Sequence, residues 1–335
     1  MLLRDLGARA YETTASKVAD LAAVRRAHGL AAGYLRSGDG GEAVLEYGRL
    51  IRQVQHARES LRTYDRISEW IEAGAAVPEG LRLETAAPER FLFFVGYSRS
   101  GHSLVGSLLD AHPDIAISHE LHAGKHLRAG AAFARVQRAI LINSFFFDHF
   151  GRGYSGYDYQ VPGQMQGRIE QLRVLGDKKA NGTTRLLRRD PALPGRFADA
   201  IPARVQYLHV VRNPFDNIVT KARRAKTSLG WAADVYLKHV AAVEALKARE
   251  GGAVIDVFLD DLVAAPRDEL EALLTALGIE SRPSGYLEAC SERLFSKPNQ
   301  TRSQLHWEPA LLRDVRARLR DCEFLARFAD EPVGE

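Results

Sequence analysis

Residues 96–103 read GYSRSGHS, and their types and spacing are those of a loop that binds a negatively charged group. Glycines let the backbone bend around an anion, and the amides of residues 100–104 can then point at its oxygens. The loop fits the phosphate-binding pattern G-x-x-x-x-G-K-S/T except at position 102, where histidine replaces lysine, and it carries Arg99 inside. The missing lysine would reach the outer phosphates of ATP, so the loop favours an anion other than a triphosphate. A tight turn without a ligand is the alternative.

Short apolar runs follow residue 88 and alternate with helical segments, which predicts a central parallel sheet in a three-layer α/β fold. The runs are RFLFFVG (90–96), DIAISHE (114–120), QLRVLGDKK (171–179), VQYLHVVRNP (205–214) and AVIDVFLDD (253–261). Ligands of an open parallel sheet bind beyond the carboxyl ends of its strands. All but the last run end in reactive or anion-binding residues, namely the glycine loop, His119-Glu120, Lys178-Lys179 and Arg212. We therefore expect these residues to meet at one edge of the sheet.

Residues 97–120, YSRSGHSLVGSLLDAHPDIAISHE, resemble the 5'-phosphosulfate loop of sulfotransferases that use 3'-phosphoadenosine-5'-phosphosulfate (PAPS). They look especially like the tyrosylprotein and Golgi-type branch of that family, whose loop reads R-S-G-T-S/T-L and is followed by L-D-A-H-P and a glutamate. The family's second signature is R-N/D-P-x-D/E with a serine eight residues after the arginine, and RNPFDNIVT is similar to it, with Thr220 at the serine position. Residues 254–280 and 296–307 also resemble family segments, so the resemblance covers about residues 90–310.

The resemblance implies a P-loop NTPase-like sulfotransferase fold and a donor site for PAPS. The loop from Ser98 to Leu104 would hold the 5'-phosphosulfate, with Arg99 at the position of the family's catalytic lysine or arginine. Arg212 and Thr220 would bind the 3'-phosphate, which suits a planar arginine fork. The implied donor-binding residues are Ser98, Arg99, Ser100, Gly101, His102, Ser103, Leu104, Arg212, Thr220, Lys297 and Arg302. The last two belong to a late basic loop that, in the family, closes over the nucleotide.

The resemblance also implies the catalytic residues Glu120, Lys178, Arg99 and His102. Lys178 would assist the leaving oxygen, and Glu120 would act as general base on the hydroxyl or amine of the acceptor. Sulfuryl transfer by in-line displacement would give 3'-phosphoadenosine-5'-phosphate (PAP) and a sulfated product, and it requires no metal. His102 stands where the family prefers threonine. Either His102 contacts the sulfate directly, or a neighbouring residue makes that contact instead. His119 or His122 takes over as base if Glu120 is a capping or salt-bridged acid.

Residues 145–159, FFFDHFGRGYSGYDY, are either a mobile lid over an apolar or aromatic acceptor or a part of the core. The expected acceptor is a hydroxyl borne by a small molecule, a carrier or a peptide. Two other functions stay open. An ATP-dependent small-molecule kinase would need a lysine at 102 and a magnesium-binding aspartate, such as Asp177 or Asp260. A catalytically silent nucleotide-binding scaffold would bind the nucleotide without turnover.

The 335 residues predict a helical extension with a linker over 1–87 and a sulfotransferase domain over 88–335. Apolar residues recur at helical spacing in the extension, which is typical of a packing surface and could support a homodimer. A net charge of +4 without a basic block argues against nucleic acid as a partner. The sequence shows neither a signal peptide nor an apolar run of membrane length. We therefore expect a cytoplasmic protein with no membrane partner, in which Cys290 and Cys322 are ordinary thiols.

Overall fold

The computed structural model describes residues 2–83, 86–294 and 299–333, and for residues 2–18 it describes the helix alone. A five-stranded parallel sheet forms the centre, with the strand order β2-β5-β1-β6-β7. Its strands are β1 (Arg90–Val95), β2 (Ile115–His119), β5 (Val174–Lys178), β6 (Arg204–Val211) and β7 (Val254–Phe258). Each of them lies within one of the apolar runs, so the expected α/β fold with a parallel sheet is confirmed.

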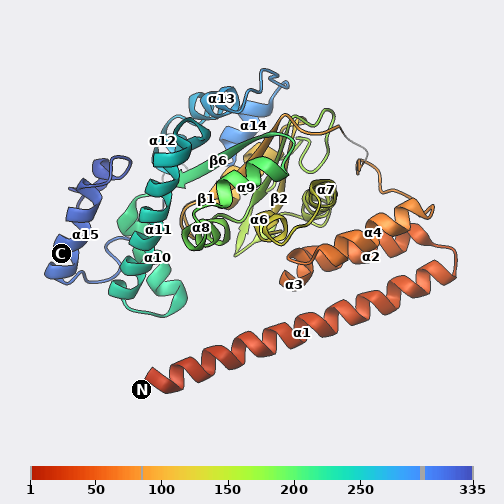
Figure 1. Cartoon of the computed structure of the whole chain (residues 1–335), viewed down its shortest axis with the longest axis horizontal. Helices are drawn as coiled ribbons and strands as arrows, with labels where there is room; N and C mark the ends of the chain where they lie inside the picture. The colour runs from red at the N-terminus through yellow and green to blue at the C-terminus, as the bar shows by residue number, and fades with distance from the viewer. Residues whose placement is uncertain (1, 84–85, 295–298, 334–335) are drawn as a thin grey trace.

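Helices cover both faces of the sheet (Figure 1). They are α1 (Leu2–Arg36), α2 (Gly40–Gln53), α3 (Gln55–Arg58), α4 (Leu61–Glu72), α5 (His102–Asp110), α6 (Ala123–Arg128), α7 (Phe133–His149), α8 (Ala180–Arg189), α9 (Leu193–Ala200), α10 (Pro214–Ala225), α11 (Leu229–Glu250), α12 (Leu259–Ala264), α13 (Pro266–Ala276), α14 (Tyr286–Glu292) and α15 (Pro309–Arg320). Two short strands, β3 (Gly153–Tyr154) and β4 (Tyr157–Asp158), form a separate antiparallel hairpin that the sequence did not predict. Within the described residues, none of the helices has the length and apolar character of a membrane span.

The side chains of β1 explain the layering, because successive residues of a strand point to opposite faces of the sheet. Phe91, Phe93 and Val95 share a core with residues of α2, α4, α6, α7, α8 and α9. Leu92 and Phe94 share another with residues of α5, α12, α13 and α14. A strand that is buried on both faces has a nearly continuous apolar sequence, as RFLFFV does. Cys290 belongs to the second core, and both cysteines are free and buried, as expected.

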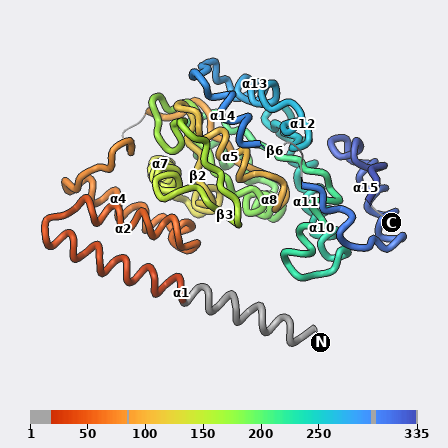
Figure 2. Tube along the Cα trace, turned by 180° about the vertical axis from the view of Figure 1, so that it is seen from behind, coloured from red at the N-terminus to blue at the C-terminus, as the bar shows by residue number. Residues whose placement is uncertain are grey.

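The N-terminal helices pack directly onto the sheet unit. Buried residues of α2 and α4 belong to the same hydrophobic core as β1 and α7, and Figures 1 and 2 show these two helices beside α7. Gly48 of α2 lies against Phe146 of α7, so the two helices approach closely. Helix α1 packs on the outer side of α2 and α3 and exposes the apolar residues Leu21, Leu30, Tyr34 and Leu35. A division at residue 87 and a homodimer through these helices stay predictions.

The close contact between Gly48 and Phe146 predicts that a larger residue at position 48 destabilises the packing of α2 on α7. A Cβ at Gly48 would come within 2.2 Å of the Phe146 ring, so Gly48→Ala should lower the free energy of unfolding by about 1–3 kcal/mol. Gly29→Ala in α1 is the matched control, because nothing lies within 4 Å of its added methyl. It should be neutral or stabilise the protein by up to about 1 kcal/mol. Denaturant unfolding of both variants checks this, and equal midpoints would show that α2 does not pack on α7 as described.

Candidate functional site

The glycine loop joins the end of β1 to the first turn of α5. Gly96 and Gly101 adopt φ values of +112° and +93°, and Arg99 between them adopts +74°. These positive values turn the backbone sharply, as expected from the glycine spacing. The amide of Gly96 donates to Thr184 Oγ1 of α8 at 2.7 Å, which fixes the start of the loop. The curled backbone and the N-terminal turn of a nine-residue helix, which includes Ser103 and Leu104, are the elements of an anion-binding loop.

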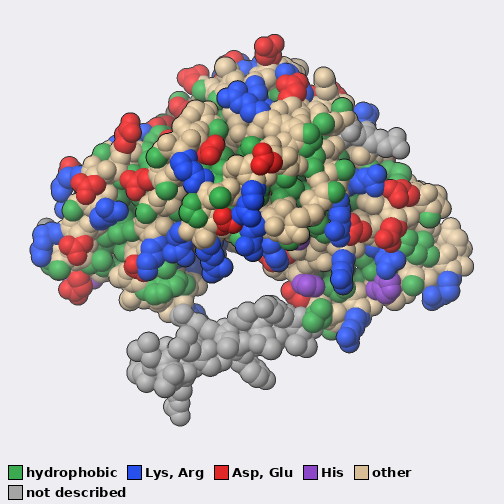
Figure 3. Space-filling model, viewed as in Figure 1, with side chains coloured by type: hydrophobic (Ala, Val, Ile, Leu, Met, Phe, Trp, Pro, Cys, Tyr) green, Lys and Arg blue, Asp and Glu red, His purple; other side chains and the backbone are tan. Residues whose placement is uncertain are grey.

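Helix α10 supports the loop from its other side. Asn217 Nδ2 donates to Ser100 Oγ at 2.8 Å, and Lys221 Nζ lies 3.4 Å from Ser98 Oγ. Burial and the charges of Arg99 and Arg185 lower the pKa of Lys221. Figure 3 shows Lys and Arg side chains gathered along the hollowed lower edge of the body. Sequence analysis missed Lys221, although it directly follows Thr220 in the second motif.

His102 lies beneath the loop. Its side chain is 6% exposed, and Nε2 is 3.0 Å from the carbonyl oxygen of Val95, to which it donates in the tautomer that carries a proton there. Burial lowers its pKa to about 3, so the ring is neutral at pH 7. This bond ties the first residue of α5 to the last residue of β1. A direct contact between this side chain and the sulfate stays a prediction, and Nε2 could make it only by breaking the bond to Val95. The backbone amide of His102 lies at the N-terminus of α5, where it could contact an anion without that change.

The second motif meets the glycine loop through Arg212. Its Nη1 donates to the carbonyl oxygen of Arg99 at 3.2 Å and to Thr220 Oγ1 at 3.3 Å, and Nη2 donates to the carbonyl oxygen of Asn299. Thr220 Oγ1 is also 2.9 Å from Thr301 Oγ1, so the late loop closes over the same place. Three segments that are far apart in the sequence are thus brought together, as the resemblance implies.

The late basic loop is placed only in part. Lys297 lies outside the described residues. Arg302 Nε is 3.5 Å from Asp216 Oδ2, and its Nη1 pairs with Glu331. The amides of Thr301 and Arg302 also donate to Asp216 Oδ1, at 2.5 and 2.7 Å. In this structure the guanidinium of Arg302 therefore holds the late loop to α10 and the C-terminal segment, and its contact with a nucleotide stays a prediction.

Glu120 lies between two lysines at the carboxyl ends of neighbouring strands. Lys178 Nζ donates to Glu120 Oε1 at 2.7 Å, and Lys179 Nζ donates to Oε2 at 2.6 Å. The register of β2 and β5 places Lys178 beside the residue before Glu120, so the sheet itself sets this pair. Burial alone would raise the pKa of Glu120, but the two lysines outweigh burial and lower it to about 2. The predicted partners meet, and the carboxylate is ionised.

The backbone turn after β2 aims Glu120 at the lysines. Glu120 and His122 both have a φ of +66°, a left-handed conformation that is unusual for these residues. Asp177 of β5 holds this turn, because its Oδ2 accepts from the amide of Ala123 at 2.8 Å and its Oδ1 accepts from Ser118 Oγ at 2.9 Å. Burial raises the pKa of Asp177 to about 6. Both oxygens of this buried aspartate are used within the fold.

The two reserve bases are neutral at pH 7. The ring of His119 stacks on Phe147 with centroids 3.9 Å apart, and burial holds the pKa of His119 well below its usual range. Burial, with the Lys179 charge, lowers the pKa of His122 to about 4. The Nε2 atoms of both rings are buried without a hydrogen-bond partner among the described residues. The charge of Glu59 opposes the shift of the pKa of His122 without outweighing it, whereas the main charges that act on His119 are all positive. Each ring is therefore a weak base.

The aromatic segment divides between core and site. Phe145, Phe146 and Phe147 are buried in α7, so this part is core. The hairpin that follows lies over the candidate site, where Lys178 Nζ is 5.2 Å from the ring centroid of Tyr154. Burial raises the pKa of Tyr159 to about 12, although the nearby Arg99 and Ser103 oppose this shift. Residues 145–147 are thus core, and a lid formed by the rest of the segment stays a prediction.

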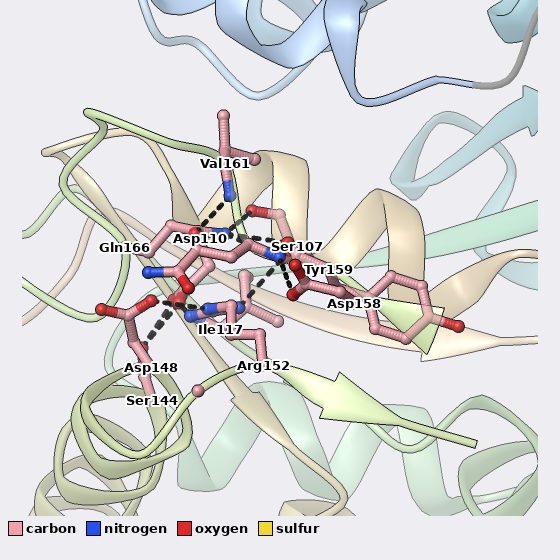
Figure 4. A network of polar contacts seen from close by, with 12 residues as sticks. Ser107, Asp110, Ile117, Ser144, Asp148, Arg152, Asp158, Tyr159, Val161 and Gln166 are labelled. Atoms are coloured by element: carbon pink, nitrogen blue, oxygen red, sulfur yellow. Dashed lines mark hydrogen bonds and ion pairs between the residues drawn. The ribbon is translucent and has the colours of Figure 1, made fainter. Parts of the chain in front are cut away.

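A buried ion pair fastens the hairpin segment to α5. Arg152 pairs with Asp110, the aspartate of the LDAHP sequence, and their side chains are 3% and 0% exposed. Asp110 Oδ1 also accepts from Ser144 Oγ at 2.7 Å and from the amide of Ile117 at 2.6 Å (Figure 4). Asp110 therefore links α5, β2, α7 and the hairpin segment. Sequence analysis gave it no role, because its partner comes from a segment without a periodic pattern.

Comparison with solved structures finds sulfotransferases. The sulfotransferase domain of the Synechococcus PCC 7002 olefin synthase is 17% identical, covers 70% of this chain and 90% of its own, and has a TM-score of 0.38. Mouse sulfotransferase SULT7A1, solved with PAP, is 14% identical, covers 75% of this chain and 92% of its own, and has a TM-score of 0.38. Sulfotransferase STF9 from Mycobacterium avium is 12% identical, covers 80% of this chain and 82% of its own, and has a TM-score of 0.43. No family model and no curated protein matches the chain.

The pair of Asp110 and Arg152 predicts a large loss of stability when one partner is removed. Asp110→Asn should lower the free energy of unfolding by about 3–5 kcal/mol, because it removes the charge of the more deeply buried of the two carboxylates that pair with Arg152, Asp110 and Asp148. Asp158→Asn is the matched control in the hairpin, since the Asp158 side chain is 66% exposed and its ion pair with Arg293 is long, at 3.7 Å. It should change stability by less than about 0.5 kcal/mol. Similar losses in the two variants would contradict the assigned role of Asp110.

Proposed function

We propose that this protein is a sulfotransferase that transfers the sulfuryl group of PAPS to a hydroxyl or amine of an acceptor and releases PAP. The observation that carries the proposal is a group of cations around the glycine loop that contact no carboxylate of a described residue. Burial lowers the pKa of Arg212 in spite of the charges of Asp216 and Asp260, neither of which forms an ion pair with it. Among the described residues, Arg99, Arg212 and Lys221 form no ion pair. Arg212 is only 7% exposed, and its contacts are to neutral oxygens. Since a buried charge is costly without an opposite one, a polyanionic ligand suits this place.

The donor roles follow from what each residue can offer. The amides of the loop and of the first turn of α5 would hold the 5'-phosphosulfate, with Arg99 beside it. Arg212, Thr220 and the loop around Thr301 would hold the 3'-phosphate, since an arginine fork and hydroxyls bind a phosphate at several oxygens. Arg212 also bonds to the Arg99 carbonyl, so the two phosphate sites are coupled. PAPS supplies an activated sulfuryl group that is ready for displacement.

The catalytic roles are those of positioned charges and a base. In the transfer, the bond between sulfur and the phosphate oxygen breaks while a bond between sulfur and the acceptor oxygen or nitrogen forms. Arg99 and Lys178 would offset the negative charge that builds on the leaving phosphate, as in phosphoryl transfer. Glu120 would take the acceptor proton. Lys178 contacts Glu120 in this structure, so a Lys178 that turns to the leaving oxygen would leave Glu120 less stabilised and more basic.

PAP and ADP differ in their 3'-phosphate, and they therefore test the donor. PAP should raise the melting temperature without magnesium and much more than ADP does, because Arg212 and Thr220 are assigned to that phosphate. Arg212→Ala should weaken PAP binding about tenfold to a hundredfold in calorimetric titration. Arg66→Ala is the control, since Arg66 is an exposed residue of α4. Equal stabilisation by PAP and ADP would contradict a PAPS donor, and a preference for magnesium ATP would favour the kinase.

Glu120→Gln tests the base, because it keeps the shape of the side chain and removes its basicity. Turnover should fall by about 100-fold to 10,000-fold, while PAP affinity changes little. The low pKa of Glu120, about 2, also predicts the pH profile of the wild type. Glu120 stays ionised from pH 5 to 8, so kcat/KM should show no acidic limb from this group in that range. Near-normal turnover of Glu120→Gln when chemistry limits the rate, or an acidic limb lost in His119→Ala or His122→Ala, would assign the base elsewhere.

A further inference from the structure

Arg58, at the end of α3, is a buried cation without an assigned partner. Its side chain comes from the N-terminal extension, outside the segments that resemble sulfotransferases, and it is 7% exposed. Its Nε and Nη1 atoms are buried without a hydrogen-bond partner, and the described residues offer it no ion pair. The acid next to it, Glu59, accepts instead from Lys179 and Gln55, each at 2.7 Å. Buried polar atoms are nearly always hydrogen-bonded, so this guanidinium requires an explanation.

The surroundings of Arg58 lie beside the proposed catalytic pair. The ring of Tyr154 is the shared contact: Arg58 Cζ is 5.5 Å from its centroid, Lys178 Nζ is 5.2 Å away, and the ring centroid of His119 is 4.4 Å away. His119 Nε2 is a second buried polar atom without a partner. A cation that faces an aromatic ring is stabilised only partly, because the ring offers no hydrogen-bond acceptor in the plane of the guanidinium. Two side chains with unpartnered polar atoms, Arg58 and His119, therefore contact the same ring as Lys178.

The net charge of this region is positive. Arg52 and Arg152 both lie over the ring of Phe147, at 5.1 and 5.4 Å from its centroid, and their charges act on His119 together with those of Arg58 and Lys178. The acids near them are already paired: Asp110 and Asp148 with Arg152, Glu120 with Lys178 and Lys179, and Glu59 with Lys179. Arg52 forms no ion pair with the described residues either, but its Nε and Nη2 donate to the carbonyl oxygens of Gly151 and Gly153. Arg58, whose Nε and Nη1 lack any partner among the described residues, is therefore the cation best placed to gain from an incoming anion.

This region differs from the donor site, because the proposed phosphate contacts use Arg99, Arg212 and Thr220. Arg58 comes from the extension and shares the ring of Tyr154 with Lys178, which bonds to the carboxylate that would take the acceptor proton. We propose, on the basis of the proposed function, that the acceptor carries an anionic group close to the reacting hydroxyl or amine, and that Arg58 binds this group with help from His119. A carboxylate, a phosphate or a sulfate has the required chemistry. The extension would thereby determine which acceptors are used.

Matched acceptors that differ in charge test this inference on the full-length protein. Suitable pairs are 4-hydroxyphenylacetate with 4-hydroxyphenylethanol, N-acetylglucosamine 6-phosphate with N-acetylglucosamine, and galactose 6-sulfate with galactose. The quantity to measure is the ratio of kcat/KM between the anionic and the neutral member, with PAP release as the signal. The wild type should prefer the anionic member of at least one pair, and the pair that responds identifies a carboxylate, phosphate or sulfate.

Three variants separate charge recognition from a structural role. Arg58→Gln should lower the ratio about tenfold to a hundredfold through a higher KM for the anionic member, and Arg58→Lys should restore a part of it. Arg62→Gln, an exposed arginine on α4, is the control and should keep the wild-type ratio. Melting temperatures and PAP titrations of all variants show whether the fold and the donor site are intact.

The outcomes distinguish this inference from the proposed function. Wild-type protein that is not stabilised by PAP and turns over no acceptor would overturn both. Wild-type protein that binds PAP and turns over acceptors, but shows no preference for the anionic member of any pair, would overturn only the role of Arg58. An Arg58→Gln ratio equal to that of the wild type would do the same. A lower ratio with unchanged PAP affinity supports the inference.

Discussion

The carboxylate of Glu120, held by two lysines, is the interaction on which the rest of the site depends. Lys178 ends β5, and Lys179 precedes α8 and also bonds to Glu59 of the N-terminal extension. One chain of ionic contacts therefore joins two neighbouring strand ends to a helix that lies outside the sheet unit. The parallel register of β2 and β5 brings these charges together, and Asp177 inside the sheet maintains the left-handed turn that directs Glu120. If this contact were removed, the buried Lys178 would lose its counter-ion, and Lys179 would keep only Glu59.

The charges of the site are therefore unevenly compensated. On the side that contains Glu120, acids and bases form ion pairs. On the glycine-loop side, Arg99, Arg212 and Lys221 form no ion pair with any described residue. Neutral groups fix the cations of the loop side in place: the carbonyl oxygens of Arg99 and Asn299 accept from Arg212. Such a cation remains available to an anion, because no carboxylate has to be displaced. An ion-paired cation would have to exchange one partner for another, at a smaller gain in free energy.

The sequence predicted the strands and the meeting of their ends because both follow from local patterns. Buried parallel strands are continuous apolar runs, and the residues after them share one edge of the sheet whatever the strand order is. Other features depend on contacts between distant segments. The strands of the hairpin are two residues long, too short to show alternation, and the three phenylalanines before it are all buried because α7 packs between the sheet and the extension. Asp110, the buried partner of Arg152, and Ser98, the partner of Lys221, come from elsewhere in the chain, so no spacing within one segment indicated these two contacts.

His102 illustrates how the context of a loop changes the meaning of its residue types. In the sequence it stands where a lysine would contact phosphate, so a direct contact with the sulfate is one of its two expected roles. In the structure the ring is buried against the end of β1, and burial makes its charged form too costly at neutral pH. The positive charge near the loop comes instead from Arg99 and from Lys221 on α10. Lys221, a long side chain on the neighbouring helix α10, reaches the loop from outside. His102 therefore does not have to carry charge and can stabilise the turn between β1 and α5. Separate residues thus hold the loop in shape and provide its charge.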